Sequence, residues 1–113
     1  VIKTGGEWIS SLALENIALS CNGIEDVAAI GLPHAKWGER PVLVAQAAKD
    51  ASPDLVRLSV MAEIQSRVDA GELSKWAVPD ELSFVDRLPK TSVGKLDKKL
   101  LRQDISTRVG LKS

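Results

Sequence analysis

Residues 89–97 read Pro89-Lys90-Thr91-Ser92-Val93-Gly94-Lys95-Leu96-Asp97. Ser92 and Gly94 are residues that favour turns, so they predict a short loop that places Lys95 near its tip. Asp97 is a good helix N-cap, which predicts that a helix begins directly after this loop. The rest of the chain is expected to form the scaffold that holds this lysine, together with a second loop near the start.

Basic residues surround the loop. Between positions 87 and 102 they are Arg87, Lys90, Lys95, Lys98, Lys99 and Arg102, and Asp97 is the only acidic residue. The local net charge is +5, in a chain whose 15 basic residues balance 15 acidic ones. Two interpretations are open: a solvated basic helix face, or a surface that meets a phosphate- or carboxylate-bearing partner.

The pair Gly94-Lys95 invites comparison with a phosphate-binding P-loop, but the match fails. That motif requires glycine where this chain has Pro89, and serine or threonine where it has Leu96. The domain is therefore not expected to hold a nucleoside triphosphate by itself.

The composition describes an ordinary small globular domain. The chain has 113 residues, 44% hydrophobic and 27% charged, which is enough for one modest core. A net charge of zero gives no global attraction to nucleic acid, and no apolar run approaches the ~20 residues of a membrane span. A single cysteine, Cys21, excludes an internal disulfide and favours a reducing compartment, so we expect a cytoplasmic protein.

Hydrophobic periodicity and capping residues predict the elements. Helices are expected over about 11–21, 53–70 and 98–109, and strands over 26–32, 42–48 and 82–85. Residues 33–41, bounded by two prolines, are expected to form the loop of a hairpin. A short two-stranded element should flank the glycine pair at positions 5 and 6. The fold class is α+β, with about three helices on a short three-stranded sheet plus this N-terminal element.

The glycine pair is the second candidate site. Gly5 and Gly6 either form a plain tight turn or provide a backbone surface that a narrow ligand can approach closely. Trp37 and Trp76 either fill the edges of a small core or border a ligand path. His34 has no nucleophile or carboxylate pattern nearby and is expected to be structural or solvated. No Cys/His spacing suits a metal, so no metal site is expected.

Taken together, these motifs resemble those of a known family. The stretch from Ile2 to Ser11, which reads IKTGGEWISS, resembles the hinge-adjacent motif of adenylate-forming enzymes, the superfamily of acyl-CoA synthetases, luciferases and peptide-synthetase adenylation domains. Residues 89–99 resemble the C-terminal lysine motif of the same superfamily. The segments 31–34 and 37–41 also match its pattern. The sequence of the first motif is most similar to that of fatty-acyl-CoA synthetases.

The resemblance implies a C-terminal mobile domain, residues 1–113, of a larger two-domain ligase. Its N-terminal domain, which would hold ATP, Mg²⁺ and the acid, is absent from this chain. The parent enzyme would convert a fatty acid and ATP to acyl-AMP and then transfer the acyl group to coenzyme A. We expect the fragment alone to be inactive, and its partners to be its own N-terminal domain and these substrates.

The resemblance also implies roles for individual residues. Lys95 matches the lysine that enters the active site for adenylation. Gly5, Gly6 and Glu7 match the loop that lines the tunnel of the coenzyme A thiol arm. Lys75 and Trp76 match a basic-aromatic stretch near the coenzyme A nucleotide in some members.

Two alternatives stay open. The parent could be another acid–CoA ligase of the same superfamily, for example one that acts on an aryl acid. In a different functional class, the chain could be a non-catalytic interaction module that binds anions through the basic surface around Lys95.

Overall fold

The computed structural model describes residues 1–90, 92–94 and 96–108. In chain order the elements are β1 (Ile2–Thr4), β2 (Glu7–Ile9), α1 (Ser11–Leu19), β3 (Ile24–His34), β4 (Gly38–Ala47), α2 (Pro53–Asp69), the short 3-10 helix η1 (Lys75–Ala77), β5 (Glu81–Phe84) and α3 (Lys98–Arg108). The predicted α+β class and the three α-helices are confirmed.

Strand β4 organises the sheet. It pairs with β3 in antiparallel fashion along its whole length. Its other edge first meets β1, at Thr4 opposite Gly38, and then runs parallel to β5, with Val42 to Ala45 opposite Glu81 to Phe84. Because of the contact at Thr4, the predicted N-terminal two-stranded element and the predicted three-stranded sheet are joined into one five-stranded sheet.

The β3–β4 hairpin is longer than the sequence predicted. The expectation of a loop over residues 33–41 was wrong, because Pro33 and Pro41 are both paired within strands and only residues 35–37 form the turn. Pro41 has no backbone N–H, which is unusual in a central strand. It is tolerated because it lies where the neighbour of β4 changes from β1 to β5.

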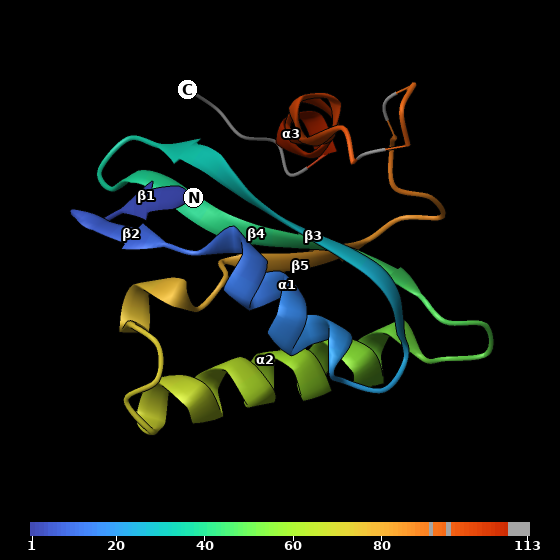
Figure 1. Ribbon diagram of the computed structural model, residues 1–113, viewed down its shortest axis with the longest axis horizontal. Coiled ribbons are helices and arrows are strands. Elements are labelled where there is room, and N and C mark those ends of the chain that lie inside the picture. The colour runs from blue at the N-terminus through green and yellow to red at the C-terminus, as the bar shows by residue number, and fades with distance from the viewer. Residues whose placement is uncertain (91, 95, 109–113) are drawn as a thin grey trace.

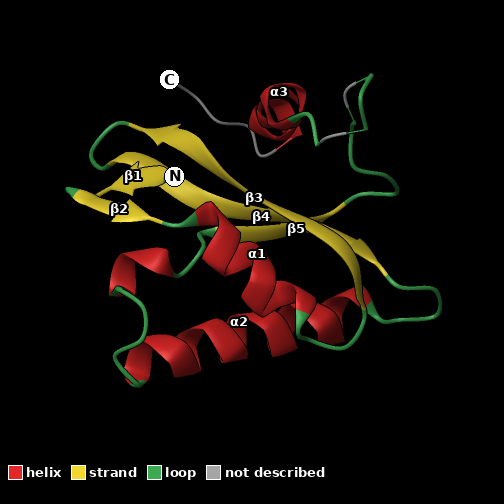
Figure 2. Cartoon of the chain, in the orientation of Figure 1, coloured by secondary structure: helices red, strands yellow, loops and turns green. Residues whose placement is uncertain are grey.

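The helices cover both faces of the sheet (Figures 1 and 2). Helices α1 and α2 lie on one face, and α3 lies on the other. Alternate residues of β4 therefore enter two cores: Leu43 and Ala45 pack with α1 and α2, whereas Val42 and Val44 pack under α3. Within the described part of the chain, no helix is long and apolar enough to cross a membrane.

Local capping explains where the helices begin. The hydroxyls of Ser10 and Ser52 accept backbone N–H bonds at the starts of α1 and α2. The carboxylate of Asp97 accepts from the N–H of Leu100 at 3.0 Å, which confirms it as the cap of α3. The predicted end of this last helix, at positions 109 and 110, lies outside the described residues.

Candidate functional site

The glycine turn between β1 and β2 belongs to a corner built from three distant segments. The N–H of Gly5 donates to the carbonyl of Trp37, in the β3–β4 turn, at 3.1 Å. The ring of Trp37 lies 4.8 Å from that of Trp76, in η1, measured between centroids. We call these three segments the glycine corner; they bring together Gly5, Gly6, Glu7, Lys75 and Trp76, the residues predicted to bind coenzyme A.

The turn that carries Trp37 is shaped by His34. The imidazole Nδ1 of His34 accepts from the backbone N–H groups of Lys36, at 3.1 Å, and Trp37, at 3.2 Å. A ring nitrogen that accepts two hydrogen bonds carries no proton, so the other nitrogen, Nε2, holds it. The prediction of a structural role for His34 agrees with these contacts.

Arg40 ties the corner together, and sequence reasoning assigned it no role. Its side chain is only 12% exposed. The guanidinium donates to Thr4 Oγ1 at 3.1 Å, the Trp76 carbonyl at 3.0 Å, the Val78 carbonyl at 2.8 Å and Asp80 Oδ1 at 2.9 Å. A planar group with five donors can satisfy such dispersed acceptors at once, whereas a lysine cannot. The sequence feature that could have indicated this role of Arg40 was a lone arginine beside an apolar strand.

The two glycines of the turn differ in what surrounds them. Both have positive φ, +58° at Gly5 and +83° at Gly6. A Cβ on Gly5 would lie 2.6 Å from the indole of Trp76, whereas a Cβ on Gly6 would meet nothing within 4 Å. Gly5 is therefore required by packing inside the domain, and Gly6 leaves an open backbone surface.

This difference predicts unequal stability effects. Gly5→Ala should lower the free energy of unfolding by about 2 kcal/mol, because a left-handed conformation is strained for alanine and the methyl group also displaces Trp76. Gly6→Ala, with backbone strain only, should lower it by about 1 kcal/mol. Urea denaturation of the two variants measures the difference; equal losses would contradict the assignment of Gly5 to packing.

Exposed lysines, two half-buried indoles and one exposed indole surround the glycine turn. The Nζ of Lys36 lies 4.7 Å from the ring centroid of Trp37, and that of Lys75 lies 5.6 Å from Trp76. On β1, the Nζ of Lys3 lies 5.3 Å from the ring of Trp8, which is 69% exposed. Indole faces can stack on a nucleobase and ammonium groups can pair with phosphates, so the corner has the chemistry to bind a nucleotide.

Glu7 is an acidic residue on this surface. It is exposed and lies opposite Thr4 in the β1–β2 pairing. Glu7 directly follows Gly6, so it borders the same open backbone surface. Its predicted contact with coenzyme A stays a prediction.

The lysine loop has a closed stem. Lys90 and Leu96 form an isolated antiparallel bridge, and the N–H of Asp97 donates to the Pro89 carbonyl at 2.8 Å. The predicted short loop before α3 is therefore present. Lys95 itself, like Thr91, lies outside the described residues, so its role stays a prediction.

The basic residues beside the loop are not uniformly solvated. Lys98 Nζ lies 2.9 Å from Glu15 Oε2, and Lys90 Nζ lies 3.1 Å from Asp26 Oδ2. The interpretation of this region as a plain solvated basic face therefore does not hold for these two lysines, which contact carboxylates on other elements.

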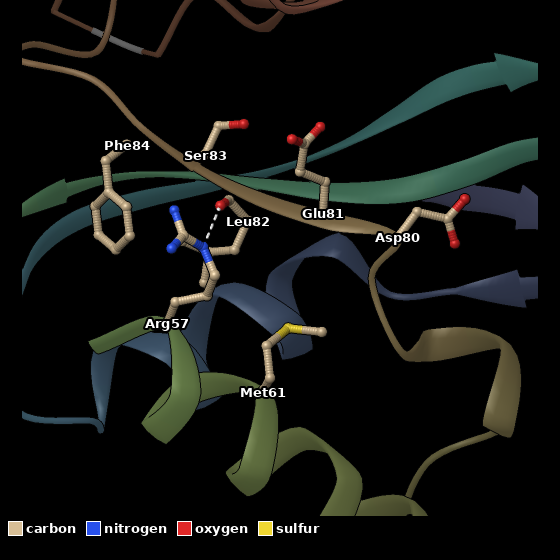
Figure 3. Close-up of a pocket in the computed structure, with 7 residues that line it drawn as sticks. All are labelled: Arg57, Met61, Asp80, Glu81, Leu82, Ser83 and Phe84. Carbon is tan, nitrogen blue, oxygen red and sulfur yellow. Dashed lines mark hydrogen bonds between the residues drawn. The ribbon is translucent and has the colours of Figure 1, made fainter. Parts of the chain in front are cut away.

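A cavity of about 500 Å³ lies elsewhere, between α2 and β5. Figure 3 shows its lining; Arg57 reaches across to the strand, where its Nε donates to the Leu82 carbonyl at 3.0 Å. Among the described strands, β5 pairs with β4 alone, so its other edge is open. The bond from Arg57 gives the Leu82 carbonyl a partner on that open edge. The cavity contains none of the residues predicted to bind or react, and we assign it a structural role.

The remaining reactive groups offer little chemistry. Burial, followed by the nearby Glu63 charge, raises the pKa of the Cys21 thiol, which makes it a poor nucleophile. In the described ranges, no three His, Cys, Asp or Glu side chains are grouped so that they could hold a metal ion.

Comparison with known proteins places this geometry in a family. The family model for the AMP-binding enzyme C-terminal domain matches residues 13–95 of this chain. The chain belongs to this family. This confirms the resemblance to adenylate-forming enzymes.

Relatives and solved structures agree with this assignment. The C-terminal domain is 47% identical over 103 residues to the 3-methylmercaptopropionyl-CoA ligase of Ruegeria pomeroyi, covering 91% of this chain and 18% of that protein. It is 39% identical to the medium-chain-fatty-acid–CoA ligase of Ectopseudomonas oleovorans, covering 91% and 18%. The apo structure of MatB from Rhodopseudomonas palustris superposes with a TM-score of 0.80 at 31% identity, covering 94% of this chain and 20% of that one. The chain thus spans about a fifth of the length of these proteins.

Proposed function

We propose that this chain is the C-terminal domain of an ATP-dependent acid–CoA ligase. In the first step a carboxylate oxygen of the acid bonds to the α-phosphorus of ATP, and pyrophosphate leaves. In the second step the deprotonated thiol of coenzyme A attacks the acyl carbonyl, and AMP leaves. The N-terminal domain would bind ATP, Mg²⁺ and the acid, and the small domain would serve each step in turn.

One observation carries this proposal: the two motifs lie at different ends of the domain. In Figure 1 the glycine turn between β1 and β2 is at one end of the sheet, and the lysine loop stands beyond α3 at the other. Motifs at opposite ends of the domain are not expected to face one active site together. A rotation of the domain between the steps would present them in succession, which supports its assignment as mobile.

Lys95 would act in the first step. The attacking carboxylate and the triphosphate are both anionic, so an ammonium placed between them offsets their repulsion and stabilises the charge that develops on the phosphoryl oxygens. A loop with a closed stem suits a cation that must be delivered and then withdrawn.

The glycine corner would act in the second step. The slender thiol arm of coenzyme A can pass close to the backbone at Gly6, where no atom of the domain obstructs it, and continue past Glu7. The nucleotide end would lie on Lys75 and Trp76. We add Lys36 and Trp37 to this proposed site, because the ring of Trp37 packs against that of Trp76 and Lys36 lies over the ring of Trp37.

The proposed acid is a fatty acid. The names of the two relatives describe ligases of aliphatic acids, one medium-chain and one a short thioether acid. These relatives favour an aliphatic over an aryl substrate. They also favour the enzyme over the alternative of a non-catalytic anion-binding module.

The cytoplasm is the proposed compartment. The single cysteine is free, which agrees with a reducing compartment.

Gly6→Trp in the intact ligase tests the proposal. The indole would occupy the proposed path of the thiol arm, so thioester formation from supplied acyl-AMP should slow by roughly tenfold or more, since small displacements of a reacting group carry large rate effects. Acyl-AMP formation, measured by exchange of pyrophosphate into ATP, should change little.

Gly6→Ala is the matched control for this test. It has the same backbone strain without the bulk of the indole, so it separates obstruction from distortion of the turn. An unchanged thioester step in Gly6→Trp, or equal losses in both steps, would contradict the proposed path.

A further inference from the structure

Glu15 links elements on both faces of the sheet. It lies on α1, and α3 lies on the opposite face (Figure 1). Its Oε2 accepts from the N–H of Ala29 in β3 at 2.9 Å and from Nζ of Lys98 in α3 at 2.9 Å. The carboxylate therefore reaches around the edge of β3 and connects three elements.

Burial makes this ion pair more than an ordinary surface contact. The side chain of Glu15 is 15% exposed and that of Lys98 is 31% exposed. The second ion pair near the loop, between Lys90 and Asp26, is more exposed, at 44% and 34%. Exposed pairs contribute little because water screens them, so the Glu15–Lys98 pair is the stronger of the two constraints.

The position of Lys98 connects this pair to the lysine loop. Lys98 is the first residue of α3 and follows Lys95 by three positions. The preceding Asp97 is bonded to Pro89, which closes the stem of the loop. A carboxylate that holds Lys98 therefore holds the downstream end of the loop against the body of the domain.

We propose that Glu15 is a positioning residue for the adenylation step, which acts through Lys98 on the lysine loop. This inference rests on the proposed function, because it assumes that Lys95 serves acyl-AMP formation. Glu15 touches no reacting atom in this proposal. It holds the first residue of α3 against the body of the domain, and thereby determines how reproducibly Lys95 is presented.

The test uses the intact ligase and the two half-reactions measured separately. Glu15→Gln keeps an oxygen that can accept from the Ala29 N–H but loses the negative charge that binds Lys98. Acyl-AMP formation should fall by about tenfold, a modest effect for a displaced catalytic group. Thioester formation from supplied acyl-AMP should stay near its original rate, because the glycine corner is not involved.

Variants of Lys98 provide the second arm. Lys98→Met should give the same selective loss, and combining it with Glu15→Gln should add little more, because both remove one interaction. Lys98→Arg keeps the charge and should recover most of the adenylation rate. Lys99→Met is the control for loss of a positive charge. Lys99 is exposed and has no ion pair among the described residues, so its substitution should leave both rates unchanged.

The outcomes separate this inference from the proposed function. Lys95→Ala, measured alongside, must impair adenylation if the function is right. If it does so while Glu15→Gln and Lys98→Met leave adenylation unchanged, the inference is wrong and the function stands. Equal losses in both half-reactions for these variants would show a merely structural role and would also overturn the inference. If Lys95→Ala spares adenylation, the proposed function itself fails.

Discussion

Replacing Lys95 with alanine in the intact ligase should slow acyl-AMP formation by roughly 10²–10³-fold, the effect of removing one preorganised group that stabilises developing charge. The reason is electrostatic: in the proposed reaction a carboxylate and a phosphate must approach each other, and the substitution removes the ammonium that would offset their repulsion. Exchange of pyrophosphate into ATP measures this step directly. The effect corresponds to about 3–4 kcal/mol of transition-state stabilisation.

Thioester formation from supplied acyl-AMP should be much less affected by the same substitution, since the lysine loop would have left the site. Lys99→Ala is the matched control, because it removes a positive charge four positions along without touching the proposed role. A loss of similar size in both half-reactions would refute the role of Lys95.

Arg40→Met should lower the free energy of unfolding by about 3–4 kcal/mol. The substitution keeps much of the apolar volume but removes the donors, so the Thr4 hydroxyl and the carbonyls of Trp76 and Val78 lose their shared partner. Partly buried acceptors left without a hydrogen bond account for most of the loss. Urea denaturation followed by tryptophan fluorescence is a suitable measurement, because Trp37 and Trp76 lie beside Arg40 in the same corner.

Arg67→Met is the control for charge and length. Arg67 pairs with Glu63 and Glu72 at the surface of the domain, and its removal should have a much smaller effect, because water replaces those contacts. Arg40→Lys should recover only part of the lost stability, since a lysine cannot reach all of the acceptors at once. Equal effects of Arg40→Met and Arg67→Met would contradict the central position assigned to Arg40.

The helices were predictable because their signals are local. Ser52 and Asp97 cap the helices that follow them, and Pro53 occupies the first position of its helix. The effect of a capping residue depends on a neighbour three positions away. The period of the apolar residues then shows which side of each helix is buried. These features operate within one or two turns of chain, so the sequence contains them in full.

The hairpin was predicted with the wrong loop because its prolines have a non-local explanation. Pro33 and Pro41 are strand breakers by local rules. In the fold, Pro41 lies at the junction of β1 and β5 along β4, a position that exists only once all three strands have assembled. A rule based on neighbouring residues cannot include that arrangement.

The candidate site shows the same division. From its residues alone the sequence determined a short loop within a basic region before the last helix, a glycine turn near the start, and the order of motifs that marks the family. Only the tertiary structure decided that Gly5 is required by the indole of Trp76 while Gly6 stays open, although the two glycines are adjacent and alike in sequence. It also decided that Arg40 holds the glycine corner together and that Glu15 meets Lys98 around the edge of β3. The physical reason is that capping, turns and periodicity act between near neighbours, whereas packing and ion pairing depend on which distant residues folding brings within a few ångströms.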